Sequence, residues 1–181
     1  MVKIVNAVGS GSFDREFDLS VVAKDLGSLA EFNEENYPGM YVRLSEDSPL
    51  ATIYRTGKFI ITGADSIDEL YDVKESLLSV LVEPGIVFKK DLEWFRFQNL
   101  VCTTVLGGDL NLNALAIGLG LEQTEYEPEQ FPGLIYRNPG FECVALIFST
   151  GKAVITGSSD LEEAEAVASF LEEELSRLQL N

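Results

Sequence analysis

The chain contains no histidine and only two cysteines, Cys102 and Cys143, among its 181 residues. The missing imidazole excludes histidine general bases and histidine-containing triads, and two isolated cysteines cannot complete a structural zinc site. Both cysteines lie inside apolar runs, which favours small buried side chains over a disulfide or a nucleophile. The GK pairs at 57–58 and 151–152 lack the upstream glycine and the following serine or threonine of a phosphate loop. Because no other catalytic constellation is present, we expect a protein that is not an enzyme and that holds neither a metal nor another cofactor.

The sequence also lacks the roughly 18 consecutive apolar residues that a membrane-spanning helix needs. Its start, MVKIVNAVG, has no signal-peptide pattern, so we expect a soluble, cytoplasmic protein. Basic residues are scarce, since 13 lysines and arginines against 30 acidic residues give a formal net charge of −17. Such acidity is typical of proteins from cells that hold molar salt, where dense carboxylates keep the surface hydrated.

What the chain does contain is an internal repeat, which changes how every other pattern is interpreted. ATIYRTGKFIITG at 51–63 aligns without gaps with ALIFSTGKAVITG at 145–157, at an offset of 94. Shorter matches join YPGMYVR (37–43) to FPGLIYR (131–137), and IVNAV (4–8) to FQNLV (97–101). We predict two repeats, 1–90 and 91–181, that meet near Glu83-Pro84-Gly85.

Each half shows the same order of elements. Runs rich in β-branched and aromatic residues predict strands at 2–8, 39–44, 50–62, 95–105, 133–137 and 144–156, with a hairpin turn at Thr56-Gly57. Asp18 and Asn111 are expected to cap short helices. A long helix closes each half, and the capping-box pairs at the two starts are Ser66 with Glu69 and Ser159 with Glu162. The order predicts an α+β fold.

One face of the predicted sheet is left without cover. The strands at 50–62 and 144–156 are apolar on both faces, yet two long and two short helices can cover only one face of a sheet of about ten strands. Side chains at period two share the open face. They are Thr52, Tyr54, Ile60 and Thr62, then Leu146, Phe148, Val154 and Thr156, with Asn6, Val8, Asn99 and Val101 on the opening strands.

The charges indicate what could meet this face. None of the 30 acidic residues falls in the strand segments, whereas seven of the 13 basic residues do. These seven are Lys3, Arg43, Arg55, Lys58, Arg96, Arg137 and Lys152. A weakly basic, apolar and aromatic sheet suits a polyanion. The alternative is that strands simply avoid Asp and Glu, which are poor strand formers.

EYEPEQFPGLIYR at 125–137, followed by IFSTGKAVITG at 147–157, resembles the second-repeat signature of the TATA-box-binding proteins of archaea and eukaryotes. The resemblance spans nearly the whole chain. It implies a saddle of two pseudo-symmetric repeats, with one curved antiparallel sheet, a concave DNA-binding face and helices on the convex face. It also implies a transcription initiation factor that binds and bends double-stranded promoter DNA in the nucleoid of an archaeal cell.

The resemblance implies a role for each residue of the open face. The amides of Asn6 and Asn99 would donate to base acceptors, assisted by Thr62 and Thr156. Apolar contacts with base edges would come from Val8, Ile60, Val101 and Val154, with Thr52 and Leu146 beside them. The aromatic pairs Tyr37 with Tyr54 and Phe131 with Phe148 would kink the duplex as wedges. Arg43, Lys58, Arg137 and Lys152 would face phosphates.

Partners follow from the same resemblance. The family docks transcription factor B at the positions that correspond to Glu127, Glu129 and Gln130. RNA polymerase would then be an indirect partner, recruited through transcription factor B. The alternative is that these residues form only a solvated acidic loop. The first repeat departs from the family at Tyr37, Tyr54 and Thr52, where phenylalanine and leucine are usual. A diverged paralogue that acts as a protein-interaction or regulatory module with weakened DNA binding therefore stays open, as does a ligand-binding sheet scaffold.

Two properties of the whole chain follow from its composition. A large exposed apolar face favours association, so a homodimer of the DNA-free protein is a further alternative. Molar salt weakens binding that depends on phosphate contacts, because the release of counterions is then less favourable. A protein that works in molar salt should instead bind DNA chiefly through apolar burial and aromatic wedges. We therefore expect weak or inverted salt dependence of DNA binding.

Overall fold

A computed structural model describes residues 1–180, which form ten strands and four α-helices. The strands are β1 (Lys3–Phe13), β2 (Ala30–Glu31), β3 (Gly39–Arg43), β4 (Leu50–Tyr54), β5 (Lys58–Ala64), β6 (Leu92–Val105), β7 (Thr124–Glu125), β8 (Leu134–Tyr136), β9 (Val144–Ile147) and β10 (Lys152–Ser158). The helices are α1 (Leu19–Leu26), α2 (Ile67–Val82), α3 (Leu112–Leu119) and α4 (Leu161–Leu178), with short 3-10 turns at Gly27–Leu29 and Lys89–Asp91. The registered strand pairs are antiparallel, so the predicted α+β class is confirmed.

The chain packs as two compact units, and β1 and β6 contribute residues to both. The first unit is Asn6–Gln98, with strand order β2-β3-β4-β5-β1-β6. The second unit joins Met1–Val5 to the chain from Asn99 onward, with strand order β1-β6-β10-β9-β8-β7. These units are defined by packing, whereas the repeats 1–90 and 91–181 stay a prediction about the sequence.

Side-chain caps fix where the helices begin. The Asp18 carboxylate accepts from the backbone N–H groups of Ser20 and Val21, and the Asn111 amide oxygen accepts from Ala114, so both predicted N-caps are confirmed. Ser66 caps α2 as predicted, because its hydroxyl accepts from the Glu69 N–H at 3.1 Å. Each contact satisfies an N–H group that the first helical turn leaves unpaired.

The predicted capping box at Ser159 and Glu162 is wrong by one residue. Asp160 is the N-cap of α4, and its carboxylate accepts from the Glu163 N–H at 2.8 Å. Glu163 in turn accepts from the Ser159 N–H at 2.9 Å. An aspartate next to a serine offers a second, equally good capping side chain, which pattern alone does not distinguish.

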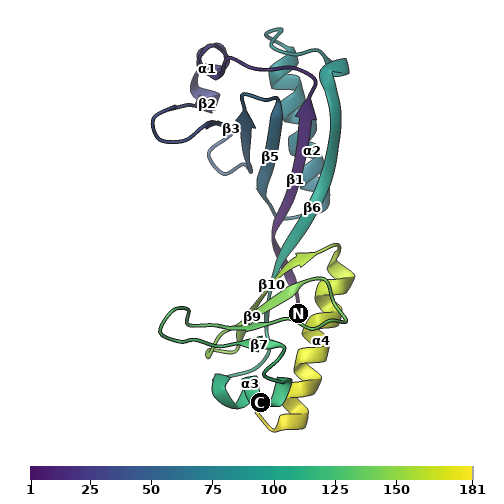
Figure 1. Cartoon of the computed structure of the whole chain (residues 1–181). Coiled ribbons are helices and arrows are strands. Elements are labelled where there is room, and N and C mark those ends of the chain that lie inside the picture. The colour runs from purple at the N-terminus through teal and green to yellow at the C-terminus, as the bar shows by residue number, and fades with distance from the viewer. Residues whose placement is uncertain (181) are drawn as a thin grey trace. The chain divides into compact units, whose positions relative to one another are not determined.

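One face of the sheet in each unit carries the core. In the first unit Met40, Ile53 and Ile61 are almost fully buried, and α2 packs against β5 with Leu70 and Leu77 also buried. In the second unit α4 packs against β10, and Leu171 and Leu175 have no exposed surface. Figure 1 shows α2 and α4 each lying along the strands of its own unit. The intervening side chains on these strands are only half-buried, so each sheet has one covered and one open face.

Two aromatic rings explain why β1 continues to Phe13 instead of ending near residue 8 as predicted. A Cβ atom at Gly9 would lie 2.6 Å from the Phe95 ring, and one at Gly11 would lie 2.4 Å from the Phe59 ring. The rings fill the space above both glycines, and this packing stabilises their backbone pairing with β5 despite the poor strand propensity of glycine. The hairpin predicted at Thr56-Gly57 is confirmed, and Gly57 there has a φ of 85°.

The two cysteines are free and buried, as predicted. Burial, followed by the nearby Glu163 carboxylate, raises the pKa of the Cys143 thiol to about 11, which keeps it protonated at neutral pH. Within residues 1–180, no helix combines the length and apolar character needed to cross a membrane.

Candidate nucleic-acid interface

The open face of the first unit is a row of aligned side chains. Strand register places Tyr41 opposite Thr52, Thr52 opposite Ile60, and Ile60 opposite Ser10. All four are half-buried, whereas their chain neighbours Met40, Ala51 and Phe59 are buried in the core. The predicted face of Thr52, Tyr54, Ile60 and Thr62 is confirmed as the side of the sheet that lacks helix cover.

The second unit repeats the arrangement with different chemistry. Its row consists of Ile135, Leu146, Val154 and Thr103, aligned by the pairing of β8, β9, β10 and β6. A neighbouring row brings Val144, Thr156 and Val101 together. These side chains are half-buried and form an apolar surface with hydroxyls only at Thr103 and Thr156.

The two asparagines lie on these open faces with different contacts. The side-chain oxygen of Asn6 accepts from the Gly63 N–H at 2.7 Å. Because an N–H group requires an acceptor, this contact orients the Asn6 amide so that its NH₂ group is available as a donor. In the second unit the Asn99 NH₂ group makes only a long contact, 3.4 Å, to the Leu100 carbonyl. Both residues are half-buried.

An aromatic pair stands at the end of the second row. The Phe131 and Phe148 rings have centroids 5.9 Å apart and are tilted by 65°, an edge-to-face contact. Gly133 permits this pair, because a Cβ atom there would lie 2.7 Å from the Phe131 ring and 3.1 Å from the Phe148 ring. Both phenylalanines are half-buried and lie outside the helical core.

The equivalent pair in the first unit consists of tyrosines joined through their hydroxyls. The Tyr37 and Tyr54 rings are 6.3 Å apart, and their hydroxyl oxygens are 2.8 Å apart. Tyr41 stacks on Tyr37 with a centroid distance of 5.3 Å. The hydrogen bond between Tyr37 and Tyr54, together with burial, raises the pKa of Tyr54 to about 12. The first unit therefore ends in a hydrogen-bonded polar cluster where the second unit has bare rings.

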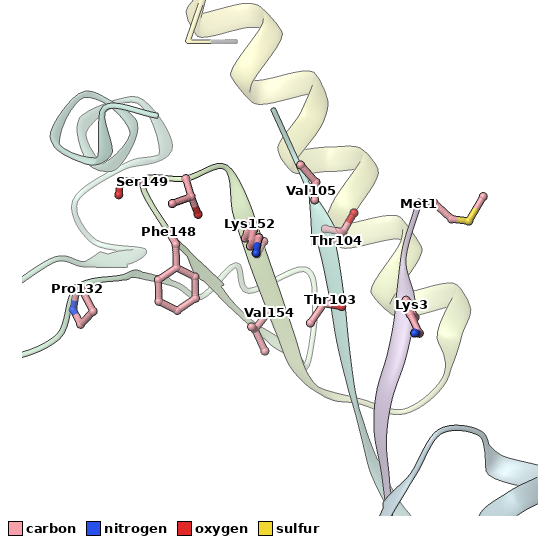
Figure 2. Close-up of a pocket in the computed structure, with 12 residues that line it drawn as sticks. Met1, Lys3, Thr103, Thr104, Val105, Pro132, Phe148, Ser149, Lys152 and Val154 are labelled. Carbon is pink, nitrogen blue, oxygen red and sulfur yellow. The ribbon is translucent and has the colours of Figure 1, made fainter. Parts of the chain in front are cut away.

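Beside each aromatic pair the open face is hollowed. The hollow of the second unit has a volume of about 630 Å³ and is mostly apolar, with Phe148, Val154, Thr103 and Pro132 among its lining residues. Figure 2 shows Phe148, Val154 and Thr103 around it, with Lys152 on β10 nearby. The first unit has a hollow of about 480 Å³ lined at matching positions by Tyr54, Ile60, Ser10 and Pro38. Repeat symmetry thus extends to the shape of the surface.

The four predicted phosphate contacts fall into two classes. Lys58 and Lys152 are exposed and form no ion pair within residues 1–180. Arg43 donates to the Ser48 carbonyl at 2.8 Å, and Arg137 lies 3.4 Å from the Glu125 carboxylate. Arg55, to which the sequence assigns no contact, is exposed and lies 3.7 Å from Glu16.

The loop before β8 contains the three predicted partner residues. Glu127, Glu129 and Gln130 are exposed, and the Gln130 side chain donates to the Glu127 carboxylate. The Glu127 carbonyl accepts from the backbone N–H groups of Gln130 and Phe131, each at 2.9 Å. The loop therefore closes on itself and carries Phe131 at its end.

Sequence reasoning missed several members of the open faces. Ser10, Tyr41, Thr103 and Ile135 line up with predicted residues but were absent from the expected set. The signal for Thr103 was available, because it lies two positions after Val101 on the same strand. The same signal was available for Ser10, which lies two positions after Val8 and continues the alternation of half-buried and buried residues along β1.

Known proteins share this sequence and fold. The family model described as "Transcription factor TFIID (or TATA-binding protein, TBP)" matches residues 1–83 and 94–178. The chain is 46% identical to TATA-box-binding protein C of Halobacterium salinarum, over 98% of both chains. It is 43% identical to TATA-box-binding protein 2 of Haloferax volcanii, over 99% of this chain and 95% of that one.

A solved structure supports the same comparison. The TBP of Methanococcus jannaschii superposes on this chain with a TM-score of 0.79 and 39% sequence identity. The match covers 97% of this chain and 98% of the other. Sequence and backbone therefore agree over nearly the full length.

Proposed function

Because the chain belongs to the TATA-box-binding protein family, a family of transcription factors and not of enzymes, we propose that it is a general transcription initiation factor. In this proposal it binds and bends A·T-rich promoter DNA through the minor groove and recruits transcription factor B, which brings RNA polymerase. The observation that carries the proposal is the open, largely apolar sheet face of each unit, bounded by an aromatic pair and an asparagine, with acidic residues opposite its rows only at the edge strands, Glu31 and Glu125.

The chemistry of these faces favours A·T pairs. In the minor groove A·T and T·A present only acceptors, whereas G·C adds a projecting amino group. Leu146, Val154 and Val101 offer that amino group no acceptor, so a guanine there loses water without gaining a hydrogen bond. The NH₂ group of Asn6, which the Gly63 contact leaves available, is a suitable donor to the base acceptors.

The aromatic pairs supply the means to bend the duplex. TATA-box-binding proteins are known to kink DNA by about 80°, through apolar wedges that enter base steps. The Phe131 and Phe148 rings are half-buried and pack on each other, and their exposed surface is accessible to a base step. Unstacking costs a few kcal/mol per step, and the additional sheet contact in the widened groove offsets it.

Docking of transcription factor B is proposed at Glu127, Glu129 and Gln130. All three are exposed, and the loop is closed by its own hydrogen bonds, so its shape is set before a partner arrives. A preformed loop loses little conformational entropy on binding. Because Phe131 lies at the end of this loop, a partner held there sits beside one of the residues proposed to enter DNA.

A bending assay tests the proposal directly. A TATA duplex labelled at both ends is titrated with the protein at molar potassium chloride, with and without transcription factor B, and the distance between the labels is measured by fluorescence. We expect binding and bending by the protein alone, with tighter binding when transcription factor B is present. A duplex in which G·C pairs replace the A·T core serves as the control.

The same assay separates the proposal from its rival, the diverged regulatory paralogue. The tyrosine cluster of Tyr37, Tyr41 and Tyr54 is the observation that favours the rival, because its hydroxyls must be desolvated to enter a base stack. Binding that occurs only through transcription factor B, without bending by the protein alone, would support the rival and refute the proposal.

A further inference from the structure

The two open faces differ in polarity at matched positions. Strand register aligns Thr52 with Tyr41 and Ile60 in the first unit, and it aligns Leu146 with Ile135 and Val154 in the second. A hydroxyl therefore stands on the first face at the two positions where the second face has only hydrocarbon. The difference is chemical and not positional, because the backbone pairing is the same in both units.

We propose that the two repeats read their halves of the DNA site with different stringency. The first repeat accepts a G·C pair in its half-site because Thr52, supported by Tyr41, can satisfy the guanine amino group. The second repeat demands A·T pairs because Leu146 cannot. This inference rests on the proposed function, since it concerns the same face and the same minor groove.

The Thr52 side chain has the chemistry that tolerance needs. Its hydroxyl makes no hydrogen bond within residues 1–180, and the residue is half-buried on the open face. A hydroxyl can accept from the guanine amino group or donate to the acceptors of adenine and thymine, so it is satisfied by either kind of base pair. It therefore removes the penalty that an apolar surface imposes on guanine.

Neighbouring groups fix the position of the Thr52 side chain on the open face. Its methyl group lies 2.8 Å from the position that a Cβ atom on Gly39 would occupy, so the methyl packs toward Gly39. Tyr41, directly opposite, is fixed by stacking on Tyr37, which is hydrogen-bonded to Tyr54. The tyrosine cluster thus keeps the surroundings of Thr52 polar and orders the strand that faces it.

The opposite argument applies to Leu146. It lies between Ile135 and Val154 in register, and the adjoining row contributes Val144 and Val101. The nearest hydroxyls of the aligned rows, Thr103 and Thr156, belong to other strands and do not replace it. A guanine amino group against this surface stays unpaired, and one mismatched base pair typically lowers protein–DNA affinity about tenfold or more.

Selection from a random duplex library tests the inference whichever way round the protein lies on its site. The full chain is used at molar potassium chloride, and the bound duplexes are sequenced. We expect an asymmetric site in which one half contains only A·T pairs and the other half also admits G·C. Single G·C substitutions stepped through the selected site should cost about tenfold in the strict half and less than about threefold in the tolerant half.

Two reciprocal variants identify the residues. Thr52→Leu gives the first repeat the second repeat's residue, and it should yield a site that is strict in both halves. Leu146→Thr makes the opposite exchange, and it should yield a site that tolerates G·C in both halves. Circular dichroism and urea unfolding show whether both variants are folded. Stringency is then measured within each variant, as the ratio of its affinities for the G·C-substituted duplexes and for the all-A·T duplex.

The possible results are distinct. A wild-type site that is equally strict in both halves would overturn this inference while leaving the proposed function intact. An asymmetric site that neither variant changes would also overturn it, since the discrimination would then come from other residues. If no A·T-rich sequence is enriched, with or without transcription factor B, both the proposed function and the inference fail. If either variant does not fold, the stepped substitutions on the wild-type protein still decide between equal and unequal halves.

Discussion

At the scale of single residues, the bond between Tyr37 and Tyr54 sets the first unit apart. The two hydroxyl oxygens lie 2.8 Å apart, and this hydrogen bond stabilises the neutral form of Tyr54. Tyr54 therefore has a pKa of about 12 in the folded protein, raised from its ordinary value of 10.0. Because the unfolded chain loses this proton first, Tyr54 contributes stability below about pH 10 that disappears as the pH rises from about 10 to about 12.

We expect Tyr37→Phe to lower the pKa of Tyr54 toward, but not fully to, its ordinary value of 10.0. The substitution removes the hydrogen bond, which is the largest cause of the shift, while burial of Tyr54 remains. Ultraviolet titration of tyrosinate absorbance measures the change. Tyr41→Phe is the matched control, because Tyr41 is the smallest of the four causes. A Tyr54 pKa that is the same in wild type and Tyr37→Phe would show that the hydroxyl contact is absent in solution.

The aromatic pairs of the two units should contribute unequally to DNA affinity and bending. We expect Phe148→Ala to lower affinity for TATA DNA about tenfold and to reduce the bend, because it removes a purely apolar ring. Tyr54→Ala should cost only about threefold, because desolvation of the Tyr54 hydroxyl already offsets part of its stacking. Fluorescence bending with the labelled duplex measures both effects. Equal losses of affinity and bend in the two variants would contradict the asymmetry.

The residues of the site could be predicted where repeat and alternation agree. Thr52, Ile60, Leu146 and Val154 lie on strands whose period-two pattern is unbroken, and the structure places all four on the open faces. Their contacts could not be predicted. Arg137 approaches Glu125, whereas Lys152 forms no ion pair within residues 1–180. These contacts depend on how the loops return to the sheet, and the spacing of residues along the chain does not encode that path.

At the scale of elements, the start of α4 shows how a local pattern can be nearly right. The backbone N–H of Ser159 donates to Glu163 and is the main cause that holds the pKa of this carboxyl below its usual range. Asp160 accepts from the Glu163 N–H in return. Ser159 is thus part of the motif, but the capping side chain is that of Asp160.

We expect Asp160→Ala to lower the free energy of unfolding by about 1 kcal/mol, the usual cost of losing an N-cap. Ser159→Ala should change it by less than about 0.5 kcal/mol, because it removes only an exposed hydroxyl contact to Glu163. Urea unfolding of both variants, at one fixed high salt concentration, gives the comparison. A larger loss in Ser159→Ala than in Asp160→Ala would restore the capping box predicted from the sequence.

Long elements could be predicted and short ones could not. All four helices and the main strands were expected, because their periodicity extends over several residues. The two-residue strands β2 and β7 are too short to show any alternation, and they form because β3 and β8 offer a free edge. The glycine-rich end of β1 was missed because its pairing depends on rings from β5 and β6 that lie far away in the sequence.

At the scale of the whole molecule, positive charge is rare and much of it is already engaged. The chain carries a formal charge of −17, and helix α4 alone exposes Glu162, Glu165, Glu172 and Glu173. Arg43, Arg55 and Arg137 contact groups of the protein itself. Among the predicted phosphate contacts, Arg43 and Arg137 must give up an internal interaction before they bind a phosphate. Lys58 and Lys152 are exposed and need not do so.

We therefore expect DNA affinity to depend weakly on salt. Counterion release from all seven strand cations would give a slope of log affinity against log salt of about −6, whereas Lys58 and Lys152 alone give about −2. Binding isotherms from low to molar potassium chloride measure the slope. Lys58→Gln and Lys152→Gln should each make it shallower by about 1. A steep slope in the wild-type protein would mean that phosphate contacts, and not apolar burial, dominate affinity.

The membership of Met1–Val5 in the second unit has a consequence for how the molecule is made. On the ribosome these five residues are made before the residues they pack with, which begin at Asn99. Met1–Val5 therefore lacks these partners until Asn6–Gln98 has been made. Met1 and Lys3 line the same hollow as Phe148, so deletion of residues 1–5 would damage the unit whose other residues begin at Asn99.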